Sequence, residues 1–462
     1  MNTEAKVIPA KPVPDASEDS REGSLVYPSY VLIVLMSCYM LSFINRQILA
    51  LLVAPMKRDL HISDSQVGLL GGAAFAIFYT FAGLPLGRLV DTRSRRNLIA
   101  VGIFLWSLMT ASCAAAGSFW TLFTGRIGVG VGEATLSPAA FSLIADYFPK
   151  KKLGRALSIY SMGIFLGTGL AYIIGGTVVQ LVTRWQTVTV PIIGTIASWR
   201  LTFLVVGLPG LLFVLWLFTI KEPIRRDLMR HADGAAMKFS FPEVFAQARL
   251  RWQSLIGLAL AMVFQSMAGF AFFSWAAAFF QRLHGWSPGH SGRTIGVMIM
   301  FFGCVGMYVG GTMSDRWQRR GVHEGPLKVG VISAVGTAIF FAAAMLNSSA
   351  TWSLIFIAPA LLFFGMPIGT AYASVQMIFP NQVRGQVSAF FMFVLNLGGL
   401  SLGPYLPGFF NDHIFRNEQM IGVSMTITIV GASLLQLILF RACYSHYRRD
   451  FERMHPSAAV AL

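Results

Sequence analysis

The sequence is poor in charge. Asp, Glu, Lys and Arg make up 12% of its 462 residues, about half of their usual share in a soluble domain. A large soluble helical protein would need charged faces between its apolar runs, and such faces are missing. Apolar runs of about 18 residues or more recur along most of the chain, and this length is typical of membrane-spanning helices. We therefore predict an integral membrane protein.

Groups that build catalytic or metal sites are also scarce. The spacing of the four cysteines fits neither a disulfide framework nor a metal site, so we interpret them as small buried side chains. No histidine falls in the middle of an apolar run, which argues against a metal or haem bound by histidine there. The Gly-x-Ser-x-Gly motif of lipases, the His-Glu-x-x-His motif of zinc proteases and the Gly-Lys motif of phosphate-binding loops do not occur at positions where they could form a catalytic site. We expect no enzyme activity, no catalytic residue, no metal and no cofactor. No ATP-binding domain is recognisable either, so transport driven by ATP would need a partner protein.

The positive charge is distributed as in membrane proteins. The formal net charge is +16, but no DNA- or RNA-binding motif occurs, and the basic residues cluster in short loops between apolar runs. The expected partner is therefore the lipid bilayer and not a nucleic acid. Loops rich in Lys and Arg face the cytoplasm, and an even number of spans then places both termini inside.

Twelve apolar segments form two sets of six. We predict a disordered cytoplasmic tail (not a signal peptide), two six-helix bundles joined by a cytoplasmic linker rich in Lys, Arg and Pro, and a second cytoplasmic tail. These parts cover residues 1–26, 27–220, 221–252, 253–443 and 444–462. The predicted spans are 27–54, 66–89, 97–117, 119–145, 156–182, 199–220, 253–281, 292–313, 327–346, 351–378, 387–410 and 420–443.

One motif occurs in both halves. Gly87-x-x-x-Asp91-x-x-x-Arg95-Arg96 follows the second segment, and Gly311-x-x-x-Asp315-Arg316-x-x-Arg319-Arg320 follows the eighth. A cytoplasmic retention signal would explain the arginines but not the matched aspartates. Such long-period similarity indicates duplicated bundles with a site between them near the membrane midplane.

Six-plus-six spans with this loop in each half resemble the major facilitator superfamily, over residues of about 27–445. Two departures are Ser94 and Gln318, where that family usually has glycine. Three stretches further resemble its Spinster branch. They are Phe43-Ile44-Asn45-Arg46-Gln47, Arg126 to Glu133 and Ser198-Trp199-Arg200. The resemblance implies an all-α fold of twelve transmembrane helices in two bundles, and proton-linked transport of lysophospholipids or sphingosine 1-phosphate.

The family resemblance also implies a gate built from ion pairs at cytoplasmic helix ends. We expect Asp91 to pair with Arg155 or with a helix end, and Asp315 to pair with Arg384. The complete predicted gate is Asp91, Arg95, Arg96, Asp146, Arg155, Asp315, Arg316 and Arg384.

Three charges fall deep inside the apolar segments. Glu133 is the only deep carboxylate by these spans, and Arg46 and Arg126 are the only deep bases. Each costs about 2.5–3.5 kcal/mol on insertion, so a function is the default interpretation, with charge-paired packing as the alternative. Since arginine does not deprotonate, Glu133 is the predicted proton carrier, and Arg126 is its expected switchable partner.

Asn45 departs from the resemblance, because the family typically has aspartate at this position. The amide has the shape of a protonated aspartate but cannot exchange a proton. Two explanations of Asn45 remain open: natural divergence of the sequence, or a substitution made to hold the protein in one conformation. The predicted proton-coupling residues are thus Glu133, Arg126 and Asn45.

The deep cluster carries a net charge of +1 or +2, which favours an anionic substrate. The second half has no deep charge but many aromatic residues, which fits an amphipathic molecule with its head at the arginines and its tail along the second half. The predicted substrate-binding residues are Arg46, Arg126, Glu133, Phe272, Trp275 and Asn396.

The leading hypothesis is a proton-coupled secondary transporter that moves an anionic amphipathic lipid by alternating access. An organic anion symporter and a multidrug exporter are the alternatives within transport, and a receptor or lipid enzyme is the alternative outside it. We expect a monomer in a bacterial inner membrane. Pro367 and Pro404 lie inside the tenth and eleventh segments, where they should kink or loosen the helices.

Overall fold

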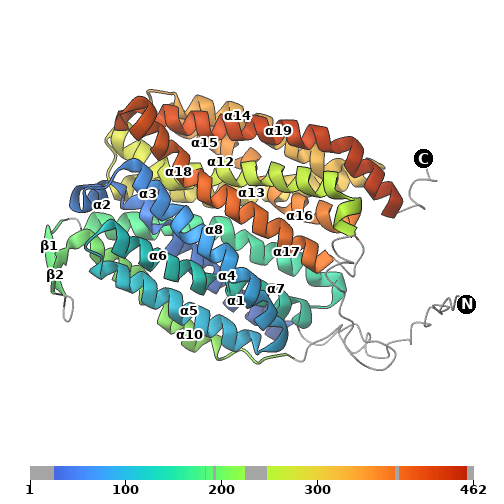
Figure 1. Ribbon diagram of the computed structural model, residues 1–462, viewed down its shortest axis with the longest axis horizontal. Coiled ribbons are helices and arrows are strands. Elements are labelled where there is room, and N and C mark those ends of the chain that lie inside the picture. The colour runs from blue at the N-terminus through green and yellow to red at the C-terminus, as the bar shows by residue number, and fades with distance from the viewer. Residues whose placement is uncertain (1–24, 183, 191–193, 224–246, 380–383, 455–462) are drawn as a thin grey trace, which may run out of the picture.

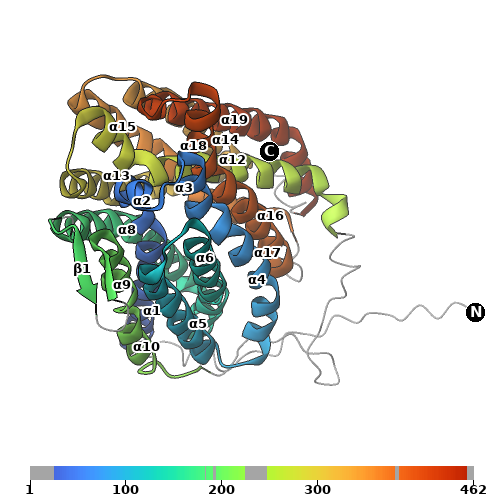
Figure 2. The same ribbon diagram turned by 60° about the vertical axis from the view of Figure 1, so that its left-hand side comes forward.

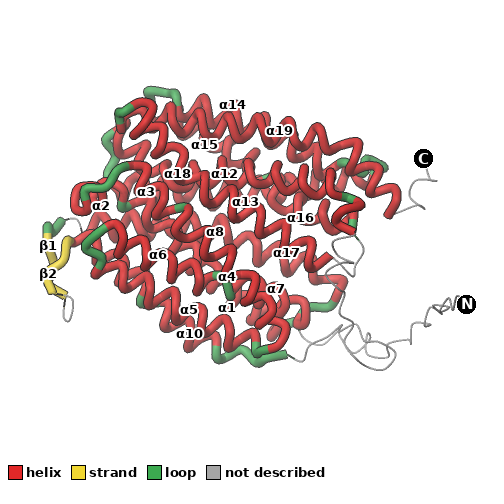
Figure 3. The backbone as a smooth tube through the Cα atoms, viewed as in Figure 1, coloured by secondary structure: helices red, strands yellow, loops and turns green. Residues whose placement is uncertain are grey.

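The computed structural model describes residues 25–182, 184–190, 194–223, 247–379 and 384–454 (Figure 1). Twelve of its helical spans are long and apolar enough to cross a membrane. They match the predicted segments one for one, and Figure 3 shows that nearly all of the described chain is helical. The predicted class, an all-α protein with twelve membrane-length helices in two sets of six, is therefore confirmed.

The first half supplies six spans. They are α1 (Val26–Gln47) with the 3₁₀ turn Ile48–Leu51, α3 (Asp64–Gly71) with α4 (Ala73–Thr92), α5 (Arg95–Ser112), α6 (Phe119–Glu133) with α7 (Leu136–Tyr147), α8 (Lys150–Val182), and α9 (Leu201–Gly207) with α10 (Gly210–Leu217). Two of the connections contain secondary structure. The first and second spans are connected through the short α2 (Val53–Leu60), and the fifth and sixth through a hairpin of β1 (Thr187–Val190) and β2 (Gly194–Ala197).

The second half supplies the other six spans. They are α12 (Trp252–His284), α13 (Pro288–Arg319), α14 (Gly325–Met345), α15 (Ala350–Gly365) with α16 (Pro367–Ile378), α17 (Arg384–Leu395) with α18 (Ser401–Phe409), and α19 (Ile421–Met454). Figures 1 and 2 show this half as one layer against the first half. The end where α1 begins and α19 stops is called the terminal end below, and the opposite end, which carries α2 and the hairpin, is called the hairpin end.

Several spans are broken where the sequence disfavours a continuous helix. The tenth span is interrupted at Met366, directly before Pro367, as predicted for this proline. Pro404 lies within α18, and the five residues directly before this helix, Asn396–Leu400, form a wider π-helical turn. Such turns often mark functional places in a helix. The fourth span breaks directly after Glu133, so this residue ends α6.

The two halves share a hydrophobic core toward the hairpin end. One buried cluster contains residues of both halves, including Tyr172 and Phe165 of α8 together with Trp275 and Ile295. A second cluster belongs to the first half apart from Leu400 and Phe270, and a third belongs wholly to the second half. In the described chain, the core that both halves build together thus lies toward the hairpin end, and the other two clusters belong mainly or wholly to one half.

Small residues allow this close contact. A Cβ atom on Gly292 of α13 would lie 2.3 Å from the carbonyl oxygen of Tyr172, and one on Gly296 would lie 2.5 Å from that of Gly169. Backbone atoms cannot move aside as a flexible side chain can, so α8 and α13 meet only because glycine stands at these positions.

Two features differ from the sequence-based expectation. The last helix continues to Met454, so residues 444–454 of the expected C-terminal tail are helical. The hairpin was not predicted, although its alternation of β-branched residues, Thr187-Val188-Thr189-Val190, is typical of a strand. The expected tail 1–26 falls almost entirely outside the described residues, as do residues 224–246 of the linker 221–252.

The glycine contact between the halves can be tested. Gly292→Val should force α8 and α13 apart, because overpacking costs roughly 1–3 kcal/mol and more against rigid backbone, and should lower the thermal unfolding midpoint in detergent by a few degrees. Gly311→Val on the same helix is the matched control, since no atom lies within 4 Å of its added Cβ. Equal midpoints for the two variants would contradict this packing.

Candidate functional site

The centre of the site is a buried ion pair between α1 and α6. Ser42 and Arg46 are four residues apart on α1 and so share one face of it. The Arg46 Nη2 lies 2.8 Å from Glu133 Oε2, and the Ser42 hydroxyl donates to the same oxygen at 2.6 Å. The exposed fraction is 8% for Arg46 and 1% for Glu133. Neither charge could remain here without the other, since an isolated buried charge is strongly unfavourable.

Arg126 has a different partner from the one that the sequence predicted. Its guanidinium donates to the backbone carbonyls of Asn45 and Arg46, at 3.1 and 3.4 Å, and forms no ion pair with Glu133. These carbonyls lie where α1 tightens into the 3₁₀ turn Ile48–Leu51. A cation is favourable at such a helix end. Arg126 therefore supports the backbone that presents Arg46, while Arg46 is the direct partner of Glu133.

Aromatic rings surround the Arg46 guanidinium. Its central carbon lies 4.3 Å from the ring centroid of Phe75, 4.8 Å from that of Phe43 and 5.3 Å from that of Tyr79. Cation–π contacts of this kind contribute about 0.5–2 kcal/mol each when desolvated. They stabilise the charged side chain within an otherwise apolar bundle.

The glycine run of α6 creates this arrangement. A Cβ on Gly130 would lie 2.6 Å from the Phe75 carbonyl oxygen, and one on Gly132 would lie 2.8 Å from the Trp106 backbone nitrogen. The backbones of α4 and α5 thus pack directly on α6, which the glycines at alternate positions allow. This close approach places Phe75 and Tyr79 beside Arg46.

Several polar atoms of the site have no partner in the part of the chain that the structure describes. The donors are the Nε atoms of Arg46 and Arg126 and Nε2 of Gln47, and the acceptors are Oε1 of Glu133 and Oδ1 of Asn45. Buried polar atoms without a hydrogen bond cost about 1–3 kcal/mol each. This mixed set can accept water, a proton or an anionic group.

Asn45 uses its amide as a donor. Its Nδ2 lies 2.9 Å from the carbonyl oxygen of Leu41. An ionised aspartate could not make this bond, because it has no proton to donate, whereas a protonated aspartate could. The geometry therefore agrees with the interpretation of Asn45 as a mimic of the protonated acid.

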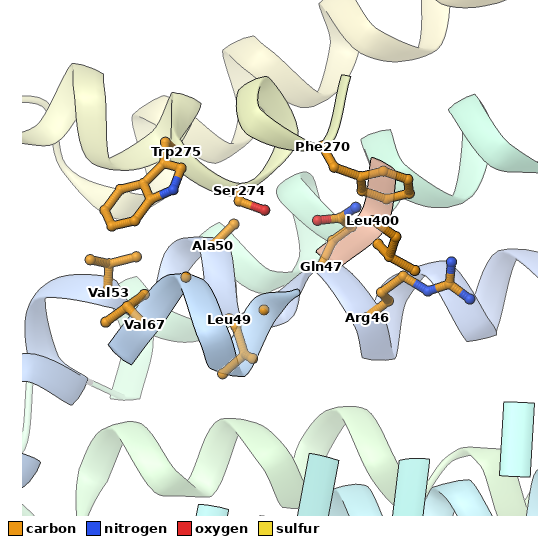
Figure 4. A pocket seen from close by; sticks show the side chains of 12 residues that line it. Arg46, Gln47, Leu49, Ala50, Val53, Val67, Phe270, Ser274, Trp275 and Leu400 are labelled. Carbon is orange, nitrogen blue, oxygen red and sulfur yellow. The ribbon is translucent and has the colours of Figure 1, made fainter. Parts of the chain in front are cut away.

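The site opens toward the second half of the molecule. A pocket at the contact between the halves is lined by Arg46 and Gln47 on one side and by Phe270, Ser274 and Trp275 on the other (Figure 4). Its accessible volume is about 20 Å³, which suffices for water but not for a lipid. A larger ligand would therefore need the halves to rearrange.

Two predicted substrate-binding residues lie elsewhere. Phe272 is fully buried, and its ring centroid is 4.7 Å from that of Phe341. Its ring packs against α14 inside the second bundle and does not line the pocket. Asn396 is half-buried in the π-helical turn that ends at Leu400, a pocket residue, and does not itself line the pocket. Trp275 does line it, and its indole N–H donates to the carbonyl of Pro404 at 2.8 Å.

A second polar cluster joins the halves at the hairpin end. Asp64, at the start of α3, is fully buried and receives two hydrogen bonds of 2.7 Å from the Arg282 guanidinium at the end of α12. Lys57 also contacts Asp64 and lies 2.6 Å from Glu418. One carboxylate thus holds two cations, one from each half. We call Lys57, Asp64, Arg282, Asn411, Asp412 and Glu418 the hairpin-end lock.

Backbone contacts complete the hairpin-end lock. The carboxylate of Asp412 accepts from the backbone N–H of Ser65 at 2.6 Å and of Asp64 at 3.3 Å. An acid of the second half therefore caps a helix of the first half, where a negative charge is favourable. Asn411 donates to Asp64 at 2.8 Å and accepts from Ser424 at 2.6 Å.

The third Spinster-like stretch has a role within the first half. Trp199 Nε1 donates to Asp59 at 3.0 Å, and Arg200 donates to the same oxygen at 2.6 and 3.0 Å. These bonds connect the start of the sixth span to α2. They lie at the hairpin end but do not cross between the halves.

At the terminal end, Arg95 is the centre of a third polar cluster. It pairs with Asp146 and, at 2.8 Å, with Glu222. Ser94 and the backbone N–H of Arg96 also donate to Glu222, each at 2.9 Å. Burial would raise the pKa of Glu222, but the bonds from Arg96, Arg95 and Ser94 outweigh it and hold this pKa below its usual range. All of these residues belong to the first half and its connection to the linker.

The remaining gate residues form no bridge between the halves in the described chain. Arg155, Asp315 and Arg316 are exposed and have no ion pair there. The side chains of Asp91 and Arg384 lie outside the described residues, so the expected Asp91–Arg155 and Asp315–Arg384 pairs stay predictions. The structure thus links the halves by charge at the hairpin end, and at the terminal end its ion pairs stay within one half.

Sequence reasoning missed the hairpin-end lock, the hydrogen bond from Ser42 and the role of Glu222. The lock residues are ordinary loop charges by composition, and their pairing requires contacts between positions more than 200 residues apart. The start of α3 carried one usable signal, because Ser63 and Gln66 form a capping box that marks the helix beginning at Asp64.

Comparison with known proteins agrees with this architecture. The model of the Major Facilitator Superfamily matches residues 35–404. Human "Protein spinster homolog 1" is 30% identical over 426 residues, which cover 88% of this chain and 77% of the human protein. An "MFS-type efflux pump" of Mycolicibacterium smegmatis is 24% identical over 422 residues, which cover 89% of this chain and 91% of the pump.

A solved structure gives the same result. A bacterial homologue of the human lysosomal transporter Spinster, crystallised in an inward-facing and unoccupied conformation, superposes with a TM-score of 0.76. It is 26% identical, and the match covers 94% of this chain and 99% of that chain.

The hairpin-end lock predicts a specific effect of Asp64. Asp64→Asn removes the charge between Lys57 and Arg282, and breaking a buried pair in this way costs about 3–5 kcal/mol, enough to invert a two-state equilibrium of a few kcal/mol. Spin labels at the exposed positions Arg184 and Gln419, one in each half, should report longer distances in this variant. Asp59→Asn, which breaks a pair within one half at the same end, is the control and should leave the distances unchanged. Distances in Asp64→Asn that equal those of the parent chain would refute the lock.

Proposed function

This chain belongs to the Major Facilitator Superfamily and is a membrane transporter of the Spinster type; from this premise we propose that it moves an anionic amphipathic lipid by alternating access, coupled to protons. The substrate class is a lysophospholipid or a sphingoid phosphate. The proton carrier is Glu133. Both assignments go beyond family membership, and they are supported by the chemistry of the central site.

One observation carries the proposal. Glu133 and Arg46 are buried together between the two ends of the bundle, yet Glu133 Oε1 and Arg46 Nε have no hydrogen-bond partner in the described chain. A purely structural ion pair would be expected to satisfy both groups, because each unmade bond destabilises the fold. The open donor and acceptor are instead available to a substrate and to a proton.

The pair also supplies a coupling mechanism. A phosphate oxygen that binds Arg46 competes with Glu133 Oε2 for the same guanidinium, which is well suited to phosphate. Glu133 then loses its cation, and in this desolvated place it is favoured to take up a proton. Binding of the anion and binding of the proton therefore stabilise each other, and such linkage is reciprocal.

The wall opposite the charges suits an apolar tail. Phe270 of α12 lies across the pocket from Arg46 and Gln47, and Trp275 lies farther along the same wall, toward Ala50 and Val53 (Figure 4). No charged residue of the second half lines the pocket. A head group at Arg46 would thus have its chain against the second half. This separation favours an amphipathic molecule over a small hydrophilic anion.

We further propose that the structure is the inward-facing state and that the terminal end is cytoplasmic. The shared core and the hairpin-end lock close the hairpin end, while the Lys and Arg residues of the loops gather at the terminal end. The relative described above as inward-facing has the same overall arrangement. A bacterial inner membrane, with a single chain as the working unit, is the proposed setting.

Drug export is the second candidate, because one similar protein bears the name "MFS-type efflux pump". A cationic drug would need carboxylates that are not neutralised. Glu133 is already paired with Arg46, and Arg126 adds a further positive charge at this depth. The electrostatics of the site thus favour an anionic substrate.

Transport in proteoliposomes tests the proposal. A pH gradient imposed in either direction should drive net movement of lysophosphatidic acid or another anionic lysolipid by the parent chain. Glu133→Gln keeps the size of the side chain but cannot exchange a proton, so it should lose the gradient-driven component by at least about tenfold and still bind the lipid. Gradient-driven movement that survives in Glu133→Gln would overturn the coupling role.

A control variant and a second substrate show what the transport assay measures. Glu452→Gln changes an exposed carboxylate at the end of α19 that pairs only with Arg448, and it should transport like the parent chain. If the protein moved ethidium, lysolipids did not compete with ethidium and no lysolipid was moved, drug export would be established instead.

A further inference from the structure

A second pocket lies far from the central site, at the terminal end of the second half. It is formed by the helical turn 247–250, the first residues of α12 and the last turns of α19. Its accessible volume is about 40 Å³, more than a single water molecule needs. The lining residues are Leu250, Arg251, Gln253, His446, Arg449, Asp450 and Arg453.

The pocket has more positive than negative charge. Three arginines line it against a single carboxylate, Asp450, which is 5% exposed and already bound. One oxygen of Asp450 accepts from the Ser254 hydroxyl at 2.6 Å, and the other lies 3.7 Å from Arg453. Arg449 forms no ion pair in the described chain. The carboxylate thus organises the pocket without neutralising it.

Arg251 is the most confined of the cations. Its Nη atoms donate to Gln247 at 2.6 Å and to the sulfur of Met454 at 3.3 Å, but its Nε is buried without a partner. Burial lowers the pKa of this guanidinium; the charge of Asp450 opposes the change, and the charge of Arg453 adds to it. Arg251 thus has a free hydrogen-bond donor and lies near a second guanidinium, that of Arg453. Both features favour the binding of an additional anion in this pocket.

The position of the pocket relative to the bilayer suggests what kind of anion this is. Leu250, Trp252 and Ile256 are exposed to 65%, 53% and 43% directly beside it. Tryptophan is enriched where the hydrocarbon region meets the head groups, and a membrane span begins at Trp252. The pocket is therefore at head-group level, with an apolar surface next to it for an acyl chain.

We propose that this pocket binds the phosphate of an anionic phospholipid in the leaflet at the terminal end. Arg251 and Arg449 contact the phosphate oxygens, and Leu250 and Trp252 contact the glycerol and upper acyl region. Positive loop charge alone explains the arginines but not their convergence from α19 and the start of α12, nor the buried free Nε. The bound lipid would connect the beginning of α12 to the end of α19.

Lipid-dependent stability of the full chain in detergent tests the proposal. Phosphatidylglycerol should raise the thermal unfolding midpoint, and phosphatidylcholine and inorganic phosphate at the same concentration should not. Arg251→Gln with Arg449→Gln should weaken the apparent affinity for phosphatidylglycerol by roughly tenfold to thirtyfold. Arg319→Gln with Arg320→Gln removes the same charge from exposed positions outside the pocket and should leave the affinity unchanged.

Each other outcome contradicts the proposal. Equal loss of affinity in the two double variants would show a nonspecific charge effect, and protection by inorganic phosphate would show a free-anion site in place of a lipid site. If the Arg251 variant does not fold, Arg449→Gln alone decides, because this side chain is exposed and makes no ion pair in the described chain. Unchanged affinity in that single variant would overturn the assignment.

Discussion

The rest of the structure depends on one contact, the buried ion pair of Arg46 and Glu133. Removing either partner would leave a charge deep in an apolar bundle, at a cost of about 3–5 kcal/mol. The surrounding sequence is arranged to keep both. The glycines of α6 bring Phe75 and Tyr79 against the guanidinium, Arg126 holds the carbonyls at the end of α1, and Ser42 supplies the second hydrogen bond to the carboxylate. A change of charge at Glu133 therefore alters the packing of α1, α4 and α6 together.

The contacts between the halves are distributed unequally. At the hairpin end, Asp64 is bound to a cation from each half, Asp412 caps α3 from the opposite half, and glycines join α8 to α13. At the terminal end, Arg95 binds Asp146 and Glu222 inside the first half. The chain connects the central pair to the hairpin-end lock directly, from Arg46 near the end of α1 through the 3₁₀ turn to Lys57 in α2. A shift of Arg46 can thus reach the hairpin-end lock through continuous backbone.

Most of the fold was predictable from the sequence, because the membrane imposes span length and hydropathy on each helix separately. The site was predictable only in part. The sequence identified Glu133, Arg46 and Arg126 by their depth, but it could not decide which arginine pairs with Glu133 in this structure, because the seven-residue spacing of Arg126 and Glu133 on one helix says nothing about how a second helix packs against it. Phe272 was selected for its type, yet its ring packs on Phe341. The hairpin-end lock was missed because charges in loops look alike until the two halves are placed together.

The central claim is that a substrate anion and a proton bind together because both act on the Arg46–Glu133 pair. Proton uptake on ligand binding measures this directly. When an anionic lysolipid is added to the purified chain in weakly buffered detergent, we predict uptake approaching about one proton per chain, and no uptake in Glu133→Gln, which should still bind the lipid. Lysolipid binding to the parent chain without proton uptake, or equal uptake by both proteins, would contradict the account.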